Sequence, residues 1–411
     1  MKIVNASKRL EHVNYAVRGP VLDAANRLAD KGEKILYLNI GNPAPFGFHS
    51  PDYLFDTISR NLFGSDAYSD SKGLIEAREA IANYARSKGI YRFNTSHVFT
   101  GNGVSELIVT TMQALLNHGD EMLVPMPDYP LWTAAVNLCG ATPVHYRCDE
   151  QADWNPDIDD LRRKITPYTR IPIRYTRGIV IINPNNPTGA VYSKEILEQI
   201  VQLAREKDLI IFSDEIYDRL CMDGIQHISI ASLCDDVLCV TFNGLSKSHM
   251  MAGFRIGWAV VSGRTEYAKE YLRGINLMAS MRLCSNVPGQ SVISAALSDP
   301  ATPNAVVQPG GRFYEQREVV YQGLNAIPGI SVIKPKAAFY CFPKLDSRFN
   351  ITDDEKFAMD FLHQEKVLLI NGTGFSWDKP DHFRVVYLPE ADVLKTAIDK
   401  LANFLSGYKQ H

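Results

Sequence analysis

The middle of the chain alternates short apolar runs with longer amphipathic segments. Between residues 95 and 262 the amphipathic segments are typical of helices, and we expect helices at Val104–Asn117, Tyr129–Leu138 and Ser193–Lys207. The apolar runs are typical of strands that are buried on both faces. These runs are Val98–Thr100, Glu121–Val124, Thr142–Tyr146, Gly178–Ile182, Leu209–Ser213, Val237–Phe242 and Ile256–Val261. The pattern predicts a mostly parallel, seven-stranded sheet between two layers of helices.

The C-terminal part of the chain has a different pattern. Its apolar runs at Ser331–Phe342, Val367–Asn371 and His382–Leu388 predict a smaller sheet, and a helix is expected at about Ala391–Leu405. The length of 411 residues leaves room for two or three domains. We therefore expect an α/β fold with a large domain over residues 47–300. A smaller α+β domain would combine residues 1–46 with residues 301–411.

Composition and charge exclude several classes of protein. The 43 basic and 46 acidic side chains give a net charge of −3 without any basic block, which argues against a nucleic-acid partner. The apolar runs are far shorter than the about 20 residues that a membrane span needs, and the N-terminus lacks the apolar core of a signal peptide. Seven scattered cysteines and the absence of metal-ligand spacing argue against disulfides and a metal site. We expect a cytoplasmic protein. A short repeat, Tyr168–Arg170 and Tyr175–Arg177, indicates a duplicated surface loop.

Chemically distinctive residues follow four of the predicted strands. Gly101–Ser105 follows the first strand, Asn183–Gly189 the fourth, Asp214–Tyr217 the fifth and Asn243–Lys247 the sixth. Ligands of open α/β sheets bind at the carboxyl ends of the strands, so these segments are expected to meet. Each segment alone has an ordinary explanation as a turn, a helix cap or a surface charge. Their convergence on one sheet edge favours a functional site.

The residues at this edge suit one kind of chemistry. A lysine in a partly apolar pocket, as expected for Lys247, loses proton affinity, and its neutral amine can form an imine with an aldehyde. Arg255, eight residues later, has a guanidinium that suits a phosphate dianion. Asp214 could cap a helix or balance a protonated ring nitrogen, and Tyr217 lies about one helical turn further on. The Gly101–Ser105 loop before a helix suits an anion, although it is not a Walker loop.

This combination of residues resembles the class I aminotransferases, which are pyridoxal-phosphate enzymes of fold type I. The spacings from Asp214 to Tyr217, from Asp214 to Lys247 and from Lys247 to Arg255 match the family pattern. Longer segments look very like the bacterial glutamate–pyruvate (alanine) aminotransferases, and this resemblance covers nearly the entire chain. The segments are Arg18–Pro20, Leu38–Gly47, Gly101–Leu107, Pro127–Trp132, Ile181–Gly189, Thr241–Lys247 and Ala252–Arg255.

The resemblance implies roles around the cofactor, pyridoxal 5′-phosphate. Lys247 would hold it through an imine and move the proton between the substrate Cα and the cofactor C4′. Asp214 would pair with the pyridinium nitrogen, whereas Tyr217 and Asn186 would hydrogen-bond the phenolic oxygen. Tyr129 would stack on the ring. The phosphate would be held by Arg255, Gly103, Val104, Ser105 and Ser246.

The resemblance also implies how substrate and subunits are arranged. Arg384 matches the arginine that binds the substrate α-carboxylate in a bidentate pair. Gly41 lies where a segment of the small domain closes over the substrate, and Tyr15 and Arg18 are further candidates for substrate contact. Tyr68 matches a tyrosine that reaches the phosphate of the neighbouring subunit. A homodimer with shared active sites is therefore implied.

Two departures from the family pattern concern the site. Gly244 stands where many members have serine, so phosphate binding would rely more on Ser246. Ser248–Met250 replaces a Thr-Tyr-Arg-like stretch of the closer relatives, which removes one positive charge. Within it, His249 is expected to be a packing or surface residue. Arg282 is expected in a surface salt bridge rather than at the substrate.

The resemblance implies a ping-pong transaminase that converts L-alanine and 2-oxoglutarate to pyruvate and L-glutamate. A branched-chain or aromatic amino donor remains an alternative, because one methylene changes the binding free energy by only about 1–3 kcal/mol. A β-lyase acting on cysteine-type substrates also stays open, since it uses the same cofactor geometry. A pyridoxal-phosphate-binding transcription regulator is not expected, because the chain before Arg18 leaves no room for a DNA-binding domain. A NAD-binding fold lacks its glycine fingerprint here.

Overall fold

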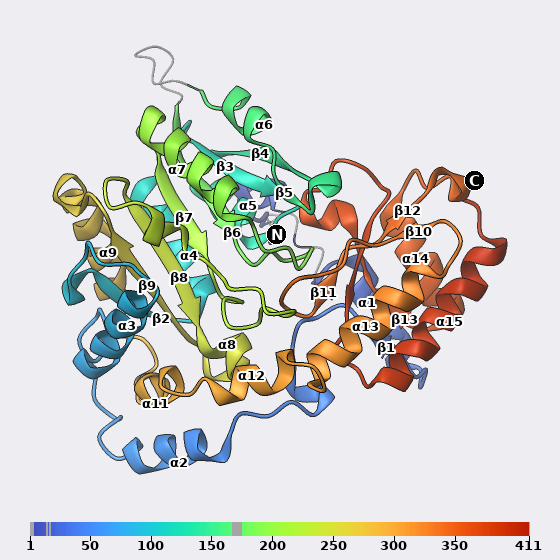
Figure 1. The fold of residues 1–411 in the computed structure, drawn as a ribbon, viewed down its shortest axis with the longest axis horizontal. Helices are drawn as coiled ribbons and strands as arrows, with labels where there is room; N and C mark the ends of the chain where they lie inside the picture. Colours follow the sequence, from blue (N-terminus) through green and yellow to red (C-terminus); the bar gives the residue numbers. More distant parts are fainter. Residues whose placement is uncertain (1–3, 14, 16–17, 167–174, 411) are drawn as a thin grey trace.

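The structure, a computed structural model, describes residues 4–13, 15, 18–166 and 175–410, and its larger part is built on one sheet (Figure 1). The strand order is β2-β9-β8-β7-β6-β3-β4-β5. Strands β8, β7, β6, β3 and β4 run parallel, whereas β9 is antiparallel to both its neighbours. The strands are β2 (Val98–Asn102), β3 (Glu121–Met126), β4 (Thr142–Asp149), β5 (Asn155–Pro156), β6 (Thr176–Ile182), β7 (Ile210–Asp214), β8 (Cys239–Gly244) and β9 (Ile256–Ser262). The mostly parallel sheet is thus confirmed, and β5 is a short edge strand that the pattern did not predict.

Helices cover both faces of this sheet, because alternate strand residues point to opposite sides and both sides are apolar. In β6, Ile179 and Ile181 join one core and Val180 and Ile182 join the other. The first face is covered by α3 (Ile75–Ser87), α6 (Ile158–Arg163), α7 (Lys194–Lys207) and α11 (Ile293–Leu297). The second face is covered by α4 (Val104–Leu115), α5 (Leu131–Leu138) and α9 (Lys269–Met281). The three helices predicted from periodicity are therefore confirmed to within a few residues.

The smaller part combines both ends of the chain, as Figure 1 shows by the blue and orange-red elements on the right. Strand β1 (Leu36–Tyr37) pairs in parallel with β13 (Val367–Leu368). A three-stranded sheet has the order β11-β15-β14, with β11 (Tyr340–Cys341), β15 (Phe383–Val386) and β14 (Ile370–Asn371), and β10 (Ile330–Ser331) pairs with β12 (Lys344–Leu345). The helices of this part are α1 (Pro20–Asp30), α13 (Arg312–Asn325), α14 (Asp354–Glu365) and α15 (Ala391–Gly407). Their apolar faces form a third core, which also takes in Tyr217 and Leu220 from the larger part.

The prediction of one strand over Ser331–Phe342 is wrong. Only its two ends are strands, because the backbone N–H groups of Lys336 and Ala337 donate to the carbonyl oxygen of Gly189 (2.8 and 2.9 Å). The segment therefore crosses to the loop after β6 and brings β11 towards the carboxyl ends of the large sheet. The domain boundaries at residues 47 and 300 stay a prediction.

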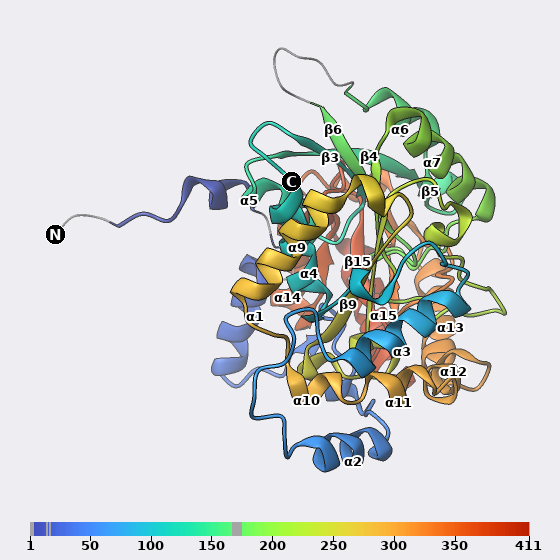
Figure 2. The ribbon, with the colours of Figure 1, turned by 90° about the vertical axis from the view of Figure 1, so that its left-hand side faces the viewer.

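The remaining elements connect these parts. They are α2 (Asp52–Asn61), α8 (Leu245–Ser248), α10 (Val287–Gln290) and α12 (Ala301–Val307). The N-terminal segment with the short helix η1 (Lys8–His12) protrudes from the rest of the molecule in Figure 2. Within the described ranges, no helix has the length and apolar character that crossing a membrane requires. The first copy of the short repeat lies outside the described residues, and the second copy leads into β6.

Candidate functional site

A cavity of about 220 Å³ lies at the carboxyl ends of β6, β7 and β8. Its lining contains all of the predicted site residues except Tyr68 and Gly103. The lining residues are Tyr15, Arg18, Ile40, Gly41, Val104, Ser105, Tyr129, Ile182, Asn186, Asp214, Ile216, Tyr217, Ser246, Lys247, Ala252, Arg255, Tyr340 and Arg384. A larger hollow of about 1020 Å³ lies at the opposite strand ends, near Arg205 and Tyr271, and none of the predicted site residues lines it. The chemistry is therefore centred on the smaller cavity.

Lys247 places a reactive amine on the cavity wall. It lies in the one-turn helix α8, directly after β8. Its Nζ donates a hydrogen bond to the carbonyl oxygen of Gly41 (2.6 Å). Burial, followed by the positive charges of Arg384 and Arg255, lowers the pKa of Lys247 to about 8 against a small opposing effect of Asp214. With this pKa about a tenth of the amine is neutral, and hence nucleophilic, at pH 7.

Asp214 ends β7 and faces the same cavity with a buried carboxylate, 3% exposed. Its Oδ2 accepts a long hydrogen bond from Trp132 Nε1 (3.4 Å), and its Oδ1 accepts one from the backbone N–H of Ile216 (3.3 Å). Burial raises the pKa of Asp214 to about 6, although these hydrogen bonds and Lys247 oppose the shift. A carboxylate that is desolvated and weakly bonded is suited to receive a cationic group of a ligand.

Tyr217 lies three residues further on, also on the cavity wall. Its hydroxyl forms a hydrogen bond with the hydroxyl of Tyr340 (2.9 Å), in which either can be the donor. Burial, followed by the neighbouring Tyr340, raises the pKa of Tyr217 well above its ordinary value. Both hydroxyls therefore stay protonated, and the one that accepts in this pair can donate to a ligand oxygen.

Arg384 and Asn186 meet across the cavity from distant parts of the chain. The Nη1 of Arg384, on β15, donates to Oδ1 of Asn186 (2.9 Å), and its Nη2 donates to the carbonyl oxygen of Asn39. The guanidinium lies between the rings of Tyr340 and Phe375, each with its centroid 4.6 Å away. Its buried Nε has no hydrogen-bond partner among the described residues. A buried guanidinium whose hydrogen bonds go to neutral oxygens is a natural receptor for a carboxylate.

An anion cradle forms where α4 begins. Gly103 has φ +87°, and a Cβ at this position would overlap the guanidinium of Arg255. The Nη2 of Arg255 donates to Ser105 Oγ (3.0 Å) and to the carbonyl oxygen of Asn102 (3.1 Å). The first N–H groups of α4, at Val104 and Ser105, have no partner within the helix and carry the positive end of its dipole. This combination of cation, hydroxyl and free N–H groups suits a phosphate.

The remaining predicted residues complete the rim of the cavity. The hydroxyl of Tyr129, two residues before α5, forms a hydrogen bond with the hydroxyl of Tyr15 (3.0 Å). Arg18 is exposed, and Ser246 is buried beside Lys247. Tyr68 is 78% exposed and does not line the cavity of its own chain.

One of the two departures from the family pattern, Gly244, has a structural explanation. A side chain at Gly244 would come within 2.5 Å of the carbonyl oxygen of Ile256, which favours glycine. His249 is fully buried outside the cavity lining, where its Nδ1 hydrogen-bonds Ser248 Oγ (2.9 Å), so it is a packing residue. Arg282 forms an ion pair with Glu106 (2.7 Å), as expected, although the pair is partly buried.

Besides the apolar lining residues Ile40, Ile182, Ile216 and Ala252, two residues that contact polar groups of the site were missed from the sequence. Trp132, fully buried on α5, bonds Asp214, and Tyr340 contacts both Tyr217 and Arg384. Trp132 was part of a recognised segment but had no assigned role. Tyr340 begins β11, within the segment Ser331–Phe342 that was predicted as one strand, and the pattern there gave no indication that the chain turns back to the cavity.

The chain is similar in sequence and in structure to known proteins. Residues 56–401 match the family model described as aminotransferase class I and II. The chain is 55% identical to the glutamate–pyruvate aminotransferase AlaA of Escherichia coli, over 100% of both chains. It is 50% identical to an alanine aminotransferase of Mycobacterium tuberculosis, over 98% of this chain and 93% of that protein. A crystal structure of an aminotransferase from Escherichia coli superposes with a TM-score of 0.97 at 55% identity, covering 100% of both chains.

Proposed function

The chain belongs to the class I and II aminotransferases, and on that premise we propose that it transfers the amino group of L-alanine to 2-oxoglutarate, giving pyruvate and L-glutamate. The observation that carries the chemistry is the convergence of Lys247, Asp214 and Arg384 on one cavity. The choice of substrates is supported by the names of relatives that are 50% and 55% identical.

Enzymes of this family use pyridoxal 5′-phosphate, which supplies an aldehyde for the amino group and a ring that accepts electrons. The cavity fits this group at three points. Lys247 offers the amine for covalent attachment, and the buried carboxylate of Asp214 offers a counter-ion for the ring nitrogen. The phosphate would be held by Arg255 and the first N–H groups of α4, where Gly103 leaves the space for the guanidinium. Tyr129 would stack on the ring.

In this proposal the residues of the chain divide the proton chemistry and the binding between them. Lys247 would take the proton from the substrate Cα and deliver it to the C4′ atom of the cofactor, because a pKa of about 8 lets its amine accept and release a proton near neutral pH. Tyr217 and Asn186 would donate hydrogen bonds to the phenolic oxygen of the ring. Trp132 keeps Asp214 in place and excludes water from it.

The proposal also assigns the substrate contacts. Arg384 binds the α-carboxylate that amino-acid and 2-oxo-acid substrates share, since its Nε is unpartnered and its Nη groups bond neutral oxygens. Gly41 and Tyr15 line the cavity together with Lys247. Arg18, exposed at the rim, is positioned to meet the second carboxylate of 2-oxoglutarate or glutamate.

We further propose a homodimer with shared active sites. The exposed apolar side chains Phe63 (99% exposed) and Tyr68 precede Ser71, whose hydroxyl accepts a hydrogen bond from Ser280 at the end of α9 (3.2 Å). Leu277 and Met281 of α9 are also exposed, so apolar residues gather on this side of the molecule. Burial of such a patch against a second copy would bring Tyr68 to the partner's phosphate site.

Two further parts of the proposal concern location and domains. Cytoplasmic location is supported by seven cysteines that are all free thiols in the described part of the chain. We keep the division into a cofactor-binding domain of residues 47–300 and a second domain of residues 1–46 and 301–411. It is supported by the apolar core that the two chain ends share.

The proposed reaction is tested with the purified holoenzyme. L-Alanine with 2-oxoglutarate should give pyruvate and glutamate in equal amounts, and a panel of amino donors should give the highest kcat/KM with alanine. A higher kcat/KM for a branched-chain or aromatic donor would overturn the choice of substrate. Ammonia release from cysteine-type substrates without any 2-oxo acid would overturn the reaction type. Lys356→Met, at an exposed ion pair with Asp360, is the matched control for variants of Lys247.

A further inference from the structure

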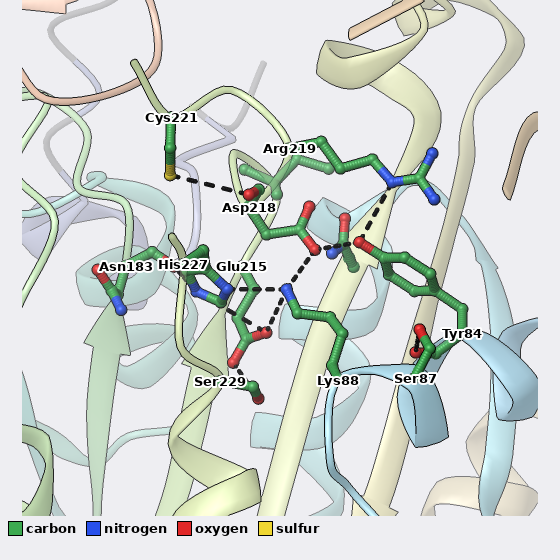
Figure 3. A network of polar contacts seen from close by, with 12 residues as sticks. Tyr84, Ser87, Lys88, Asn183, Glu215, Asp218, Arg219, Cys221, His227 and Ser229 are labelled. Atoms are coloured by element: carbon green, nitrogen blue, oxygen red, sulfur yellow. Dashed lines mark hydrogen bonds and ion pairs between the residues drawn. The ribbon is translucent and has the colours of Figure 1, made fainter. Parts of the chain in front are cut away.

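A polar network centred on the amine of Lys88 joins side chains from distant segments of the chain (Figure 3). The segment Asp214–Asp218 has two faces. Asp214 and Tyr217 line the cavity, whereas Glu215 and Asp218 contact the amine of Lys88, which follows the last residue of α3. The Nζ of Lys88 lies 2.5 Å from Oδ2 of Asp218 and 3.7 Å from Oε2 of Glu215. A cation from a distant helix is thus held against the segment that carries two site residues.

The network continues from Lys88 to the loop that carries Asn186. Lys88 Nζ lies 2.7 Å from Nδ1 of His227, and the His227 Nε2 lies 3.0 Å from the carbonyl oxygen of Asn183. An ammonium can only donate, so Nδ1 accepts and the proton of the neutral ring is on Nε2, from where it donates to Asn183. Burial, followed by the charge of Lys88, lowers the pKa of His227 to about 3, which keeps this ring neutral. Asn183 directly follows β6 and opens the turn to Asn186.

The carboxylates of this network are fully desolvated and depend on Lys88. Glu215 accepts hydrogen bonds from Ser213 Oγ (3.0 Å) and Ser229 Oγ (2.6 Å), and Asp218 accepts one from the hydroxyl of Tyr84 (2.5 Å). Among the lysines and arginines that the structure describes, only Lys88 lies within 4.0 Å of these two carboxylates.

Lys88 is the main group that opposes the effect of burial on the pKa values of both carboxylates. Burial is the largest effect on Asp218 and raises its pKa, but Lys88, together with His227 and Tyr84, outweighs burial and brings the pKa to about 2. At Glu215 burial prevails over Lys88 and raises the pKa to about 7. Loss of the ammonium would leave Asp218 as an uncompensated buried charge.

We propose that Lys88 is a positioning residue for the cofactor. The ammonium of Lys88 occupies the place that a structural metal ion would take. It ties together Glu215, Asp218 and His227, and through them it fixes the chain segments that carry Asp214, Tyr217 and Asn186. The inference rests on the proposed function, because the groups so fixed are those that would hold the cofactor ring. Lys88 itself does not line the cavity.

The arrangement of the ligands supports the comparison with a metal site. One ligand atom from each of Glu215, Asp218 and His227 lies within 4.8 Å of the others, as in a carboxylate and imidazole site. The amine of Lys88 already contacts all three side chains, so the positive charge that such a set requires is supplied by the chain itself. In metal sites, removal of a residue that holds the ligands in place typically lowers the affinity for the metal by about 10–100-fold.

The test compares variants of Lys88 by cofactor binding without substrate. Lys88→Met removes the charge and keeps the side-chain stem, and we expect it to raise the Kd for pyridoxal 5′-phosphate by about tenfold or more. The visible band of the bound cofactor changes at a pH that is set by Asp214, Tyr217 and Asn186. We also expect this pH to shift in the variant. Lys356→Met should leave both quantities unchanged. Wild-type affinity and an unshifted transition in a folded Lys88→Met variant would overturn the inference.

Chemical rescue separates the charge of Lys88 from its packing. Lys88→Ala removes three methylenes and the amine, which n-propylammonium can replace. Propylammonium should restore cofactor affinity relative to wild-type protein at the same propylammonium concentration, a reference that is needed because the amine also forms an imine with free pyridoxal 5′-phosphate. n-Propanol, which lacks the charge, should not restore it. Restoration by Zn²⁺ would equally support a cation site. If neither cation restores affinity in a variant with native circular dichroism, the charge is not the feature that matters and the inference fails.

A second pair of variants tests the link to Asn183 if the Lys88 variants do not fold. His227→Gln keeps an acceptor and a donor, whereas His227→Leu keeps neither. The Kd for the cofactor should rise in the leucine variant and recover most of the way in the glutamine variant. Equal affinities of the two folded variants would contradict the link. Failure of the wild-type protein to bind pyridoxal 5′-phosphate would instead contradict the proposed function, so the two failures are distinguishable.

Discussion

The amine of Lys247 donates a hydrogen bond of 2.6 Å to the carbonyl oxygen of Gly41, although 206 residues separate the two in the chain. The contact joins the N-terminal segment to the end of the large sheet. On its other side, Gly41 is so close to Phe339 and Tyr340 that a side chain would overlap both rings. The reactive amine is therefore enclosed by residues from the N-terminal, middle and C-terminal parts of the chain.

Gly41→Ala should impair catalysis more than folding. The added methyl group would displace the hydroxyl of Tyr340 and thereby its hydrogen bond to Tyr217. Misplacement of site groups by about 1 Å typically costs about 10²-fold, so we expect a loss of this size in kcat/KM for alanine. Steady-state kinetics and thermal unfolding measure the two effects. A variant with wild-type kcat/KM would show that the close contact at Gly41 is not needed.

Arg384→Met should weaken the binding of every substrate that carries an α-carboxylate. The guanidinium is buried and already aligned by Asn186 and two aromatic rings, so its loss removes a desolvated, charge-assisted contact. We expect kcat/KM to fall by about 10²-fold or more for both alanine and 2-oxoglutarate. Arg18→Met is the comparison, and it should raise KM for 2-oxoglutarate but not for alanine. Equal effects of the Arg384 variant on substrates with and without an α-carboxylate would refute the assignment.

The attachment of pyridoxal 5′-phosphate to the cofactor-free protein should depend on pH through Lys247. Only the neutral amine reacts, and its pKa is lowered to about 8. The rate constant should therefore rise with pH and level off above about 8, and absorbance after rapid mixing measures it. In Arg384→Met one of the neighbouring cations is lost, so the plateau should move to higher pH. A rate that keeps rising to pH 10 would indicate an ordinary solvated lysine.

Asp214→Asn should lower activity and stabilise the cofactor-free protein. Burial raises the folded pKa to about 6, above the ordinary 3.8, so the folded protein binds more protons between these values and stability falls as pH rises through this range. Above pH 6 the buried carboxylate costs about 1–3 kcal/mol, which the amide avoids. Turnover should fall by about 10³-fold, because the ring nitrogen loses its counter-ion. Urea unfolding of the cofactor-free forms at pH 4 and pH 8 should show the stability gain only at pH 8.

Much of the site could be predicted because the chemically distinctive residues lie at the ends of predicted strands. Asp214 is the last residue of a buried apolar strand, and Asn186 and Lys247 closely follow two others. Parallel strands place such positions at one edge of the sheet. Arg384 has no comparable local signal. It lies on a four-residue strand of the smaller part, and only the resemblance to a family pointed to it.

The parts that could not be predicted depend on contacts between distant segments. Tyr340 reaches the cavity because Lys336 and Ala337 bond the carbonyl oxygen of Gly189, a pairing that no periodicity within either segment encodes. Lys88 looks like any surface lysine near the end of an amphipathic helix. Its burial follows from the acids after β7, which come to lie beside α3 only when the sheet has formed.

The most direct test of the whole account is to find where the cofactor is attached. The holoenzyme is treated with borohydride, digested and analysed by mass spectrometry, with Lys356→Met and Lys247→Ala proteins treated in parallel. The account predicts a pyridoxyl adduct on the peptide that contains Lys247 in the wild-type and Lys356→Met proteins, and no adduct in Lys247→Ala. An adduct on a different lysine, or an unmodified Lys247 peptide from active enzyme, would contradict it.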